Sequence, residues 1–298
     1  MVLQAFKSYV KGDSTLDPHK QHIFHNRDSA KLVENFVTFC QVDERLEPTV
    51  VRDYRVFATR FLNFCKGNIN RDSVRDYLQS YTTKAPKTYN NQLCGLKAFV
   101  GRYLKHPEYV EGFKKAYVDN NYDIVLPNKV QVKLGFDAQE GDRDKAIYLF
   151  YATSGLRKNE ALKLNRFMDI DYEMRCIKSK HSTRTKKAGV SFYNDECEIY
   201  LKQYLESRKD SNAKLFCIGT RDFNSIWQKA TKVSGVKITA QILRKWHSTE
   251  LGELGVPDRY VDVFQGRAPK SVIAKHYTGK ELERLSRIYQ KADLRVLS

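Results

Sequence analysis

The sequence predicts a mainly helical protein with a small antiparallel β-sheet, divided into two domains. Residues 28–120 and 137–298 both place apolar side chains at helical spacing. Between them, residues 121–136 lose that periodicity, which is typical of a linker. Short apolar runs around a basic turn at 178–192 predict the sheet. We expect residues 1–27, which are polar and irregular, to form a flexible arm.

Four amphipathic segments make up the first domain. Residues 30–41 and 47–66 repeat apolar side chains three and four positions apart, so each helix can bury one face. Residues 69–82 and 86–105 complete an all-helical bundle. The last segment also interleaves basic residues with tyrosines, a mixture suited to phosphate contacts; a solvated basic face is the alternative. The candidate phosphate contacts are Lys87, Lys97, Arg102 and Lys105.

The second domain opens with a buried helix that we expect to end at Gly155. Arg157 follows directly, at the start of the next helix, and Glu160 lies one turn further on. We expect the Glu160 carboxylate to steady Arg157, whose planar guanidinium then faces a phosphate. A plain surface arginine is the alternative. After the sheet, helices are expected at 195–209, 221–232, 239–254, 257–264 and 269–291.

The charge of the chain indicates the class of its partner. There are 52 Lys and Arg residues against 35 Asp and Glu residues, a formal net charge of +17, and both halves of the chain are basic. A broad positive surface favours a polyanion, nucleic acid first, because neutralised phosphates release counterions. The alternative is a soluble basic protein with no such partner.

The turn of the hairpin expected at 178–192 is rich in cations. A turn between two twisted strands can enter a DNA groove, or it can bring an ammonium group to a phosphodiester bond. A solvated basic loop is the alternative. The cations in question are Lys180, Arg184, Lys186 and Lys187.

Other features of the sequence narrow the class of protein. The six cysteines lie far apart without zinc-site spacing, so we expect buried thiols in a reducing compartment. The sequence contains no cluster of carboxylates that would indicate a metal site. The first 30 residues have no apolar stretch like that of a signal peptide, and no window approaches 18 apolar residues. We therefore expect a cytoplasmic protein, associated with the nucleoid, with no membrane contact.

Four sequence elements share an order and a register. The segment 154–162 reads S-G-L-R-K-N-E-A-L, close to the pattern T-G-L-R-x-x-E-L. Leu243-Arg244 matches the centre of H-x-L-R-H, and Gly255-Val256 begins eleven residues after that arginine. Gly266-Arg267 stands where a Leu-Gly-His motif would end, and Tyr277 comes ten residues after Arg267. In these elements the chain resembles the tyrosine recombinases, the phage lambda integrase family, over residues 137–280 and more loosely over 30–116.

The resemblance implies a fold and a reaction. A helical core DNA-binding domain at 28–120 and a catalytic domain at 137–298 would form a clamp around DNA. The family cleaves and rejoins DNA through a 3′-phosphotyrosine intermediate, which integrates or excises a mobile element or viral genome. It acts as a tetramer on two double-stranded attachment sites, without metal or small-molecule cofactor. The helix after the tyrosine then docks on a neighbouring protomer or packs on its own domain.

The resemblance also assigns roles to residues. Tyr277 is the expected nucleophile, and the permanently charged Arg157 and Arg244 would clamp the phosphate. Lys186 is the first choice for the general acid that protonates the leaving 5′-hydroxyl, with Lys180 and Lys187 in reserve.

The chain departs from the family pattern at the histidines. Gln241 replaces the first histidine, Lys245 replaces the second, and Arg267 replaces the last one. With these substitutions the chain resembles the integrases of archaeal viruses and plasmids, the fusellovirus type. Gln241 and Arg267 can still donate hydrogen bonds to a phosphate, but neither is a plausible base. His276 and His247 are the histidines that could compensate for that loss. Two alternatives follow, a catalytically decayed DNA-binding protein and a type IB topoisomerase-like relaxing enzyme.

Overall fold

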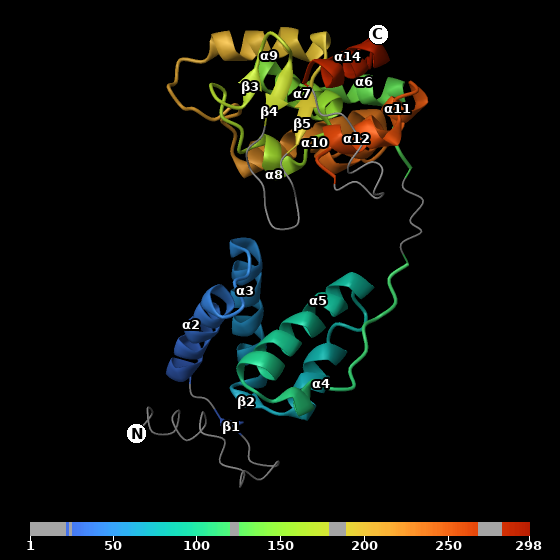
Figure 1. Ribbon diagram of the computed structural model, residues 1–298. Helices are drawn as coiled ribbons and strands as arrows, with labels where there is room; N and C mark the ends of the chain where they lie inside the picture. Colours follow the sequence, from blue (N-terminus) through green and yellow to red (C-terminus); the bar gives the residue numbers. More distant parts are fainter. Residues whose placement is uncertain (1–21, 24–25, 120–124, 179–188, 268–281) are drawn as a thin grey trace. The chain divides into compact units, whose positions relative to one another are not determined.

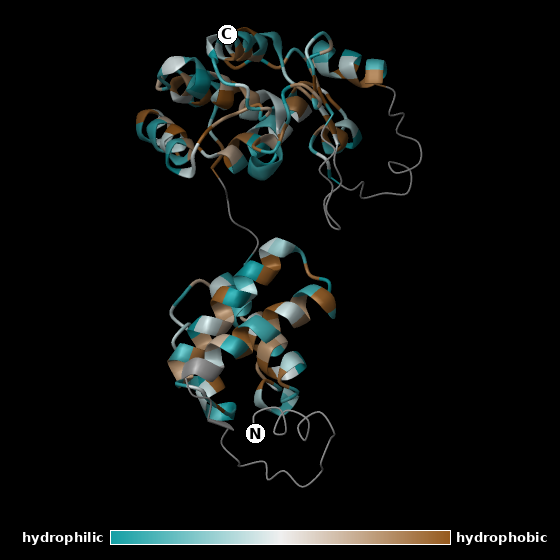
Figure 2. Cartoon of the chain, turned by 90° about the vertical axis from the view of Figure 1, so that its left-hand side faces the viewer, coloured by the Kyte–Doolittle hydropathy of each residue, from teal (hydrophilic) through white to brown (hydrophobic). Residues whose placement is uncertain are grey.

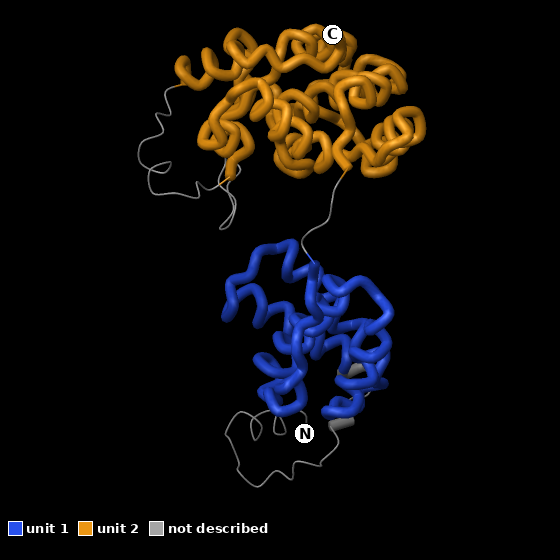
Figure 3. Tube along the Cα trace, turned by 90° about the vertical axis from the view of Figure 1, so that its right-hand side faces the viewer, with its two compact units in different colours: residues 1–122 blue, residues 123–298 orange. Residues whose placement is uncertain are grey.

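Two compact units make up the chain, residues 1–122 and residues 123–298 (Figure 3). Both consist mainly of helices, and the second contains a three-stranded antiparallel sheet (Figure 1). This confirms the mainly helical class with a small antiparallel sheet. The structure is a computed structural model, and it describes residues 22–23, 26–119, 125–178, 189–267 and 282–298.

The first unit contains the four expected helices. A short strand pair, β1 (His22–Ile23) with β2 (Asn68–Ile69), adds an antiparallel contact. The fourth expected helix changes character, because α5 continues as a π-helix rather than as a regular α-helix. The helices are α2 (Asn26–Val42), α3 (Pro48–Cys65), α4 (Arg71–Gln79), α5 (Pro86–Leu96), the π-helix η1 (Lys97–Tyr103) and the 3₁₀ helix η2 (Pro107–Tyr109).

Aromatic rings fill the core of the first unit. The rings of Phe36 and Phe99 meet edge to face at 5.0 Å, and Phe61 meets Tyr77 in the same way at 5.1 Å. These geometries are the favourable ones for aromatic pairs. Figure 2 shows both hydrophobic and hydrophilic colours along the helices of this unit, as expected for helices that bury one face.

The second unit begins with a helix that we expected to be linker. Helix α6 (Lys129–Asp137) starts with a capping box, in which Asn128 Oδ1 accepts from the Gln131 backbone N–H at 2.9 Å. Gln131 Oε1 accepts from the Asn128 backbone N–H at 3.0 Å in return. Val132 and Phe136 are buried in the core of this unit. The expectation of a linker through residues 121–136 is therefore wrong from residue 129 onward.

Helix α7 (Gly141–Ser154) lies at the centre of the second unit. Every residue from 146 to 154 is buried, which explains why its sequence is apolar on all sides. Around it lie α8 (Lys158–Ala161), α9 (Asp195–Ser207), α10 (Thr220–Ser234), α11 (Ala240–Glu253), α12 (Asp258–Phe264) and α14 (Leu282–Ala292).

The sheet confirms the expected hairpin strands. Its order is β3 (Ile170–Asp171), β4 (Cys176–Lys178) and β5 (Val190–Phe192), all antiparallel. Cys176 pairs with Phe192, and Lys178 pairs with Val190. The strands that flank the basic segment 179–188 are thus in register.

The C-terminal helix packs on its own unit, which was one of the two expected arrangements. Leu285 and Tyr289 of α14 are buried, and the Tyr289 hydroxyl donates to the Thr153 backbone oxygen at 2.7 Å. The residues after the helix are held as well, because the Val296 N–H donates to the Glu196 carboxylate at 2.7 Å.

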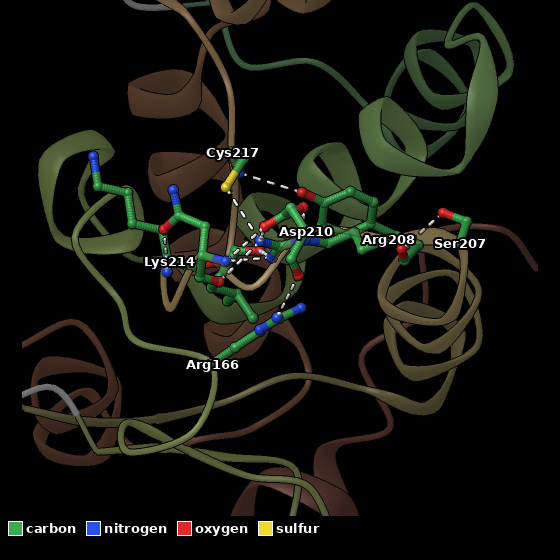
Figure 4. Close-up of polar contacts among 9 residues, drawn as sticks. Arg166, Ser207, Arg208, Asp210, Lys214 and Cys217 are labelled. Carbon is green, nitrogen blue, oxygen red and sulfur yellow. Dashed lines mark hydrogen bonds and ion pairs between the residues drawn. The ribbon is translucent and has the colours of Figure 1, made fainter.

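One buried arginine organises the loop between α9 and α10 (Figure 4). The Arg208 side chain is 4% exposed, and its Nε and Nη2 donate to the Asp210 carboxylate at 2.9 and 2.5 Å. Nη1 donates to the backbone oxygens of Lys214 and Leu215 at 2.8 and 3.0 Å. These bonds to a permanent cation fix a loop that has little regular structure of its own.

Candidate active site

The first part of the site is the junction of α7 and α8. Gly155 ends α7 in the left-handed region, at φ 60°, as expected for a glycine C-cap. Arg157 then precedes the first turn of α8, and the Glu160 carboxylate accepts from its backbone N–H at 3.0 Å and from its Nη1 at 2.6 Å. The expected support of Arg157 by Glu160 is confirmed. Because the Arg157 side chain is 26% exposed, its guanidinium still has a face open to a ligand.

Arg244 occupies the centre of the site, on α11. Its side chain is 4% exposed, and its guanidinium joins two other segments. Nη1 donates to the Gly155 backbone oxygen at 2.7 Å, and Nη2 donates to the Gln265 backbone oxygen at 2.5 Å. Burial, and next the positive charge of Arg157, lower the pKa of Arg244 to about 10. Arg244 therefore stays charged at neutral pH and retains donors for an anion.

Arg267 completes a group of three arginines. It follows Gly266, which has φ 56°, and its backbone N–H donates to the Asp262 backbone oxygen at 2.8 Å. Its guanidinium lies 3.5 Å from the Asp262 carboxylate, and the side chain is 39% exposed. The charge of Arg267 is also felt by Arg244, whose pKa it helps to lower. The structure thus brings together Arg157, Arg244 and Arg267 from three separate segments.

Gln241 lies three residues before Arg244 on α11. Residues three apart share one face of a helix, so both side chains leave α11 on the same side. Gln241 is exposed, in contrast to the buried Arg244.

Two buried polar residues lie beside Arg244: Gln265, which was not among the expected members of the site, and His247, which was considered only as a compensating histidine. Gln265 and His247 are both completely buried, and the Gln265 Nε2 lies 3.0 Å from the His247 Nδ1. Gln265 Nε2 also donates to the Arg244 backbone oxygen at 2.8 Å. Burial and the charge of Arg244 lower the pKa of His247 to about 3, so this histidine is neutral at physiological pH. It is therefore enclosed and unsuited to receive a proton from a DNA-bound nucleophile.

Glycine allows two close approaches around these groups. A Cβ atom at Gly155 would lie 2.5 Å from the His247 Nδ1, and one at Gly189 would lie 3.0 Å from the Gly266 Cα. The first contact brings the end of α7 against α11. The second brings the residue before β5 against the turn that carries Arg267.

Several expected site residues lie outside the described part of the chain. They are the nucleophile candidate Tyr277, the lysines Lys180, Lys186 and Lys187, Arg184, and His276. Two described points border these segments. Gly189 follows the lysine-bearing segment, and Arg267 precedes the segment that contains Tyr277.

The expected phosphate contacts of the first unit are all exposed. Lys87 lies on α5, Lys97 begins η1, and Lys105 follows η1 with φ 62°. Arg102 differs from these lysines because its Nε pairs with the Glu44 carboxylate at 3.2 Å. A π-helical turn often marks a functional site, and here it carries two of the four candidates, Lys97 and Arg102.

The described residues contain no group of three or more His, Cys, Asp and Glu side chains placed to hold a metal ion. Among the same residues, no helix combines the length and the apolar character that crossing a membrane requires.

Comparisons with known proteins agree with this architecture. The DNA-bound integrase of the Tn1549 transposon superposes with a TM-score of 0.61 at 14% identity, over 87% of this chain and 98% of that one. A lambda integrase dimer bound to a core site gives 0.60 at 11% identity, over 85% and 97%. No curated protein sequence matches the chain significantly. Residues 129–284 match the phage integrase family, and their extent, more than half of the chain, shows that this protein belongs to that family.

Proposed function

We propose that this protein is a site-specific recombinase that cleaves and rejoins DNA through a 3′-phosphotyrosine on Tyr277. The convergence of Arg157, Arg244 and Arg267 carries the proposal, because three cations from separate segments would repel one another without an anion to share. Two carboxylates lie beside them: Glu160 is hydrogen-bonded to Arg157, and Asp262 lies 3.5 Å from the Arg267 guanidinium. Among the described residues, no carboxylate lies closer than 4.0 Å to the Arg244 guanidinium, so two negative charges face three positive ones. A phosphodiester supplies the missing negative charge.

The reaction follows from the chemistry of these groups. The Tyr277 oxygen attacks the scissile phosphorus, and the bond from phosphorus to the 5′-oxygen of the next nucleotide breaks. Arg157 and Arg244 donate to the two non-bridging oxygens, where negative charge develops. The departing 5′-oxygen takes a proton from a lysine, for which Lys186 is the first candidate. Attack of a 5′-hydroxyl from a partner duplex on the phosphotyrosine then frees Tyr277 and joins the new strand.

The replaced histidines fit the phosphate-binding part of this scheme. Both replacements offer N–H donors: Gln241 lies three residues before Arg244 on α11, and Arg267 follows the end of α12. Neither can take the tyrosine proton, and His247 is enclosed, so we assign that step to no described residue. The same substitutions favour a source among viruses or plasmids of archaea, in which the protein would integrate or excise the element.

DNA would be held by both units. The Tn1549 and lambda integrase structures are complexes with DNA, and the exposed lysines of the first unit supply cations for the phosphate backbone. We propose that the two units form a clamp around an attachment site and that four protomers act on two duplexes in the cytoplasm.

The test is covalent capture. A pool of nicked duplexes with randomised sequence is incubated with the protein, and denaturant-resistant protein–DNA adducts are purified and sequenced. We expect wild-type adducts to share one sequence and the Tyr277→Phe variant to form none. Adducts that persist in Tyr277→Phe would contradict the assignment. If Arg157→Ala alters no DNA-dependent property, the decayed DNA-binding alternative holds, and relaxation of any supercoiled plasmid would favour the topoisomerase-like alternative.

The general acid can be identified with a modified substrate. A 5′-bridging sulfur leaves without protonation, so it removes the need for an acid. We expect the Lys186→Ala variant to cleave the normal substrate more slowly than wild type. It should cleave the sulfur substrate at close to the wild-type rate. Lys180→Ala and Lys187→Ala are the matched controls, and rescue of one of them instead would move the role to that lysine.

A further inference from the structure

Gln265 makes a reciprocal contact with Arg244. Its side-chain Nε2 donates to the Arg244 backbone oxygen at 2.8 Å, while its own backbone oxygen accepts from the Arg244 Nη2 at 2.5 Å. The residue is completely buried. Both the backbone and the guanidinium of Arg244 are therefore held by a single residue that comes just before Gly266 and Arg267.

The proton positions in this contact follow from the acceptor types. A backbone oxygen can only accept, so the amide nitrogen of Gln265 must face Arg244. The second N–H of the same amide then points to the His247 Nδ1 at 3.0 Å, which must accept it. His247 consequently carries its single proton on Nε2 and is neutral. A second proton on Nδ1 would place two N–H donors against each other. The neutral form is therefore favoured, as it also is by the burial of the ring.

The two donors of the amide are thus fully used. The buried His247 Nδ1 would otherwise lose a hydrogen bond on folding. The Arg244 oxygen, inside α11, gains a second donor beside its helical bond. A leucine, which the family pattern places before the Gly-His pair, offers no donor at all. A leucine at position 265 could fill the space beside Arg244 but could not hydrogen-bond to it. In this chain the hydrogen-bonded pair of Gln265 and His247 occupies that space.

We propose that Gln265 is a positioning residue for the phosphate-binding Arg244. The neutral His247 in turn holds the Gln265 amide in the orientation that this role requires. The proposal rests on the proposed DNA cleavage and adds Gln265, which the sequence pattern does not identify as a site residue. Because Arg244 Nη2 is fixed by Gln265 and Nη1 by Gly155, the guanidinium plane is set before DNA arrives. Catalytic donors act best when their orientation needs no adjustment during the reaction.

The first test compares two buried glutamines. Gln265→Met keeps the shape of the side chain and removes its donors. Gln139→Met is the matched control, since Gln139 is also buried in the second unit and donates to the backbone oxygens of Gly135 and Ile226 at 2.7 and 3.2 Å. We expect single-turnover adduct formation to fall at least ~10-fold in Gln265→Met, with DNA affinity within about threefold of wild type. Gln139→Met should cleave at the wild-type rate.

Rescue separates positioning from packing. His247→Gln supplies another acceptor for the Gln265 amide and should retain most of the cleavage rate, whereas His247→Leu should lose rate as Gln265→Met does. The double variant His247→Leu, Gln265→Met should be little slower than either single variant, because the pair acts as a unit. Wild-type cleavage by Gln265→Met, or full additivity in the double variant, would overturn the proposal.

A second readout does not depend on activity. In ¹⁵N spectra, a fixed guanidinium gives separate Nη1 and Nη2 resonances, and a freely rotating one gives an average. We expect separate Arg244 resonances in the wild type and an averaged one in Gln265→Met, with Arg244→Lys for assignment. The His247 Nδ1 should also be unprotonated at pH 6. A protonated Nδ1, or equal Arg244 spectra in both proteins, would overturn the positioning role, whereas absence of any wild-type adduct would overturn the proposed cleavage alone.

Discussion

The carboxylate of Glu160 receives two hydrogen bonds from Arg157, one from its backbone and one from its side chain. One of its oxygens also lies 4.0 Å from the Arg244 Nη1. Glu160 is therefore placed between two of the three arginines. It fixes the position of Arg157 without covering the exposed part of its guanidinium.

Replacing this carboxylate tests its role. Glu160→Gln turns an N–H group toward one of the two Arg157 donors, so we expect Arg157 to lose its fixed position. Adduct formation should slow by roughly 10- to 100-fold, with DNA affinity changed by less than about threefold. Glu198→Gln is the control, because it breaks pairs with Arg175 and Lys202 on another part of the unit. Equal effects of the two substitutions would contradict a specific role for Glu160.

The glycine at the end of α7 is expected to be irreplaceable. A Cβ atom at Gly155 meets the His247 ring at 2.5 Å, and φ 60° is unfavourable for any other residue. Gly155→Ala should lower the free energy of unfolding by at least about 2 kcal/mol. In Gly252→Ala the new methyl group meets open space inside α11, so that variant should be neutral or slightly stabilising. Urea denaturation of both variants measures the difference.

The neutral state of His247 predicts a loss of stability in acid. An unfolded histidine takes up a proton near pH 6.5, whereas burial and the charges of Arg244 and Arg267 lower the pKa of His247 to about 3. Between these values the unfolded chain binds more protons, so stability decreases as the pH falls, by about 1.4 kcal/mol per unit from this group. His247→Gln should therefore lose about 2 kcal/mol less than wild type between pH 7.5 and pH 5.0. Urea denaturation at both pH values checks this difference, and equal losses would contradict the assignment.

The first unit should bind DNA through its free lysines more than through Arg102. Lys87→Ala and Lys97→Ala should each reduce the slope of log affinity against log salt concentration by about 1. Arg102 already pairs with Glu44 at 3.2 Å, so Arg102→Ala should change that slope little. Fluorescence anisotropy at several salt concentrations gives the slopes. A larger effect for Arg102 than for Lys97 would show that the ion pair opens to DNA.

Local sequence was sufficient for the parts of the site built from neighbours in the chain. Gly155, Arg157 and Glu160 lie within six residues of one another, so a glycine C-cap and a capping carboxylate can be recognised directly. The start of α6 carried a comparable signal, Asn128 with Gln131 three residues later. The apolar residues that follow, Val130, Val132, Leu134 and Phe136, are spaced two apart, and this alternation does not predict a helix.

The contacts of Gln265 could not be predicted in the same way. His247 and Gln265 are separated by 18 residues, and polar side chains are ordinarily assigned to the surface. Their burial depends on α12 returning to lie against α11, which is a property of the tertiary fold. The replacement of leucine in the family pattern was the one available signal, and it could not show which acceptors the amide would meet.

The close approach of Gly189 to Gly266 gives the site a mechanical property. With no side chain between them, the backbone that leaves the lysine-bearing segment rests on the backbone that enters the segment of Tyr277. The proposed acid and the proposed nucleophile thus depart from a single anchor point. A side chain at position 189 would push these two stretches of backbone apart, so both borders of the site depend on the absence of one methyl group.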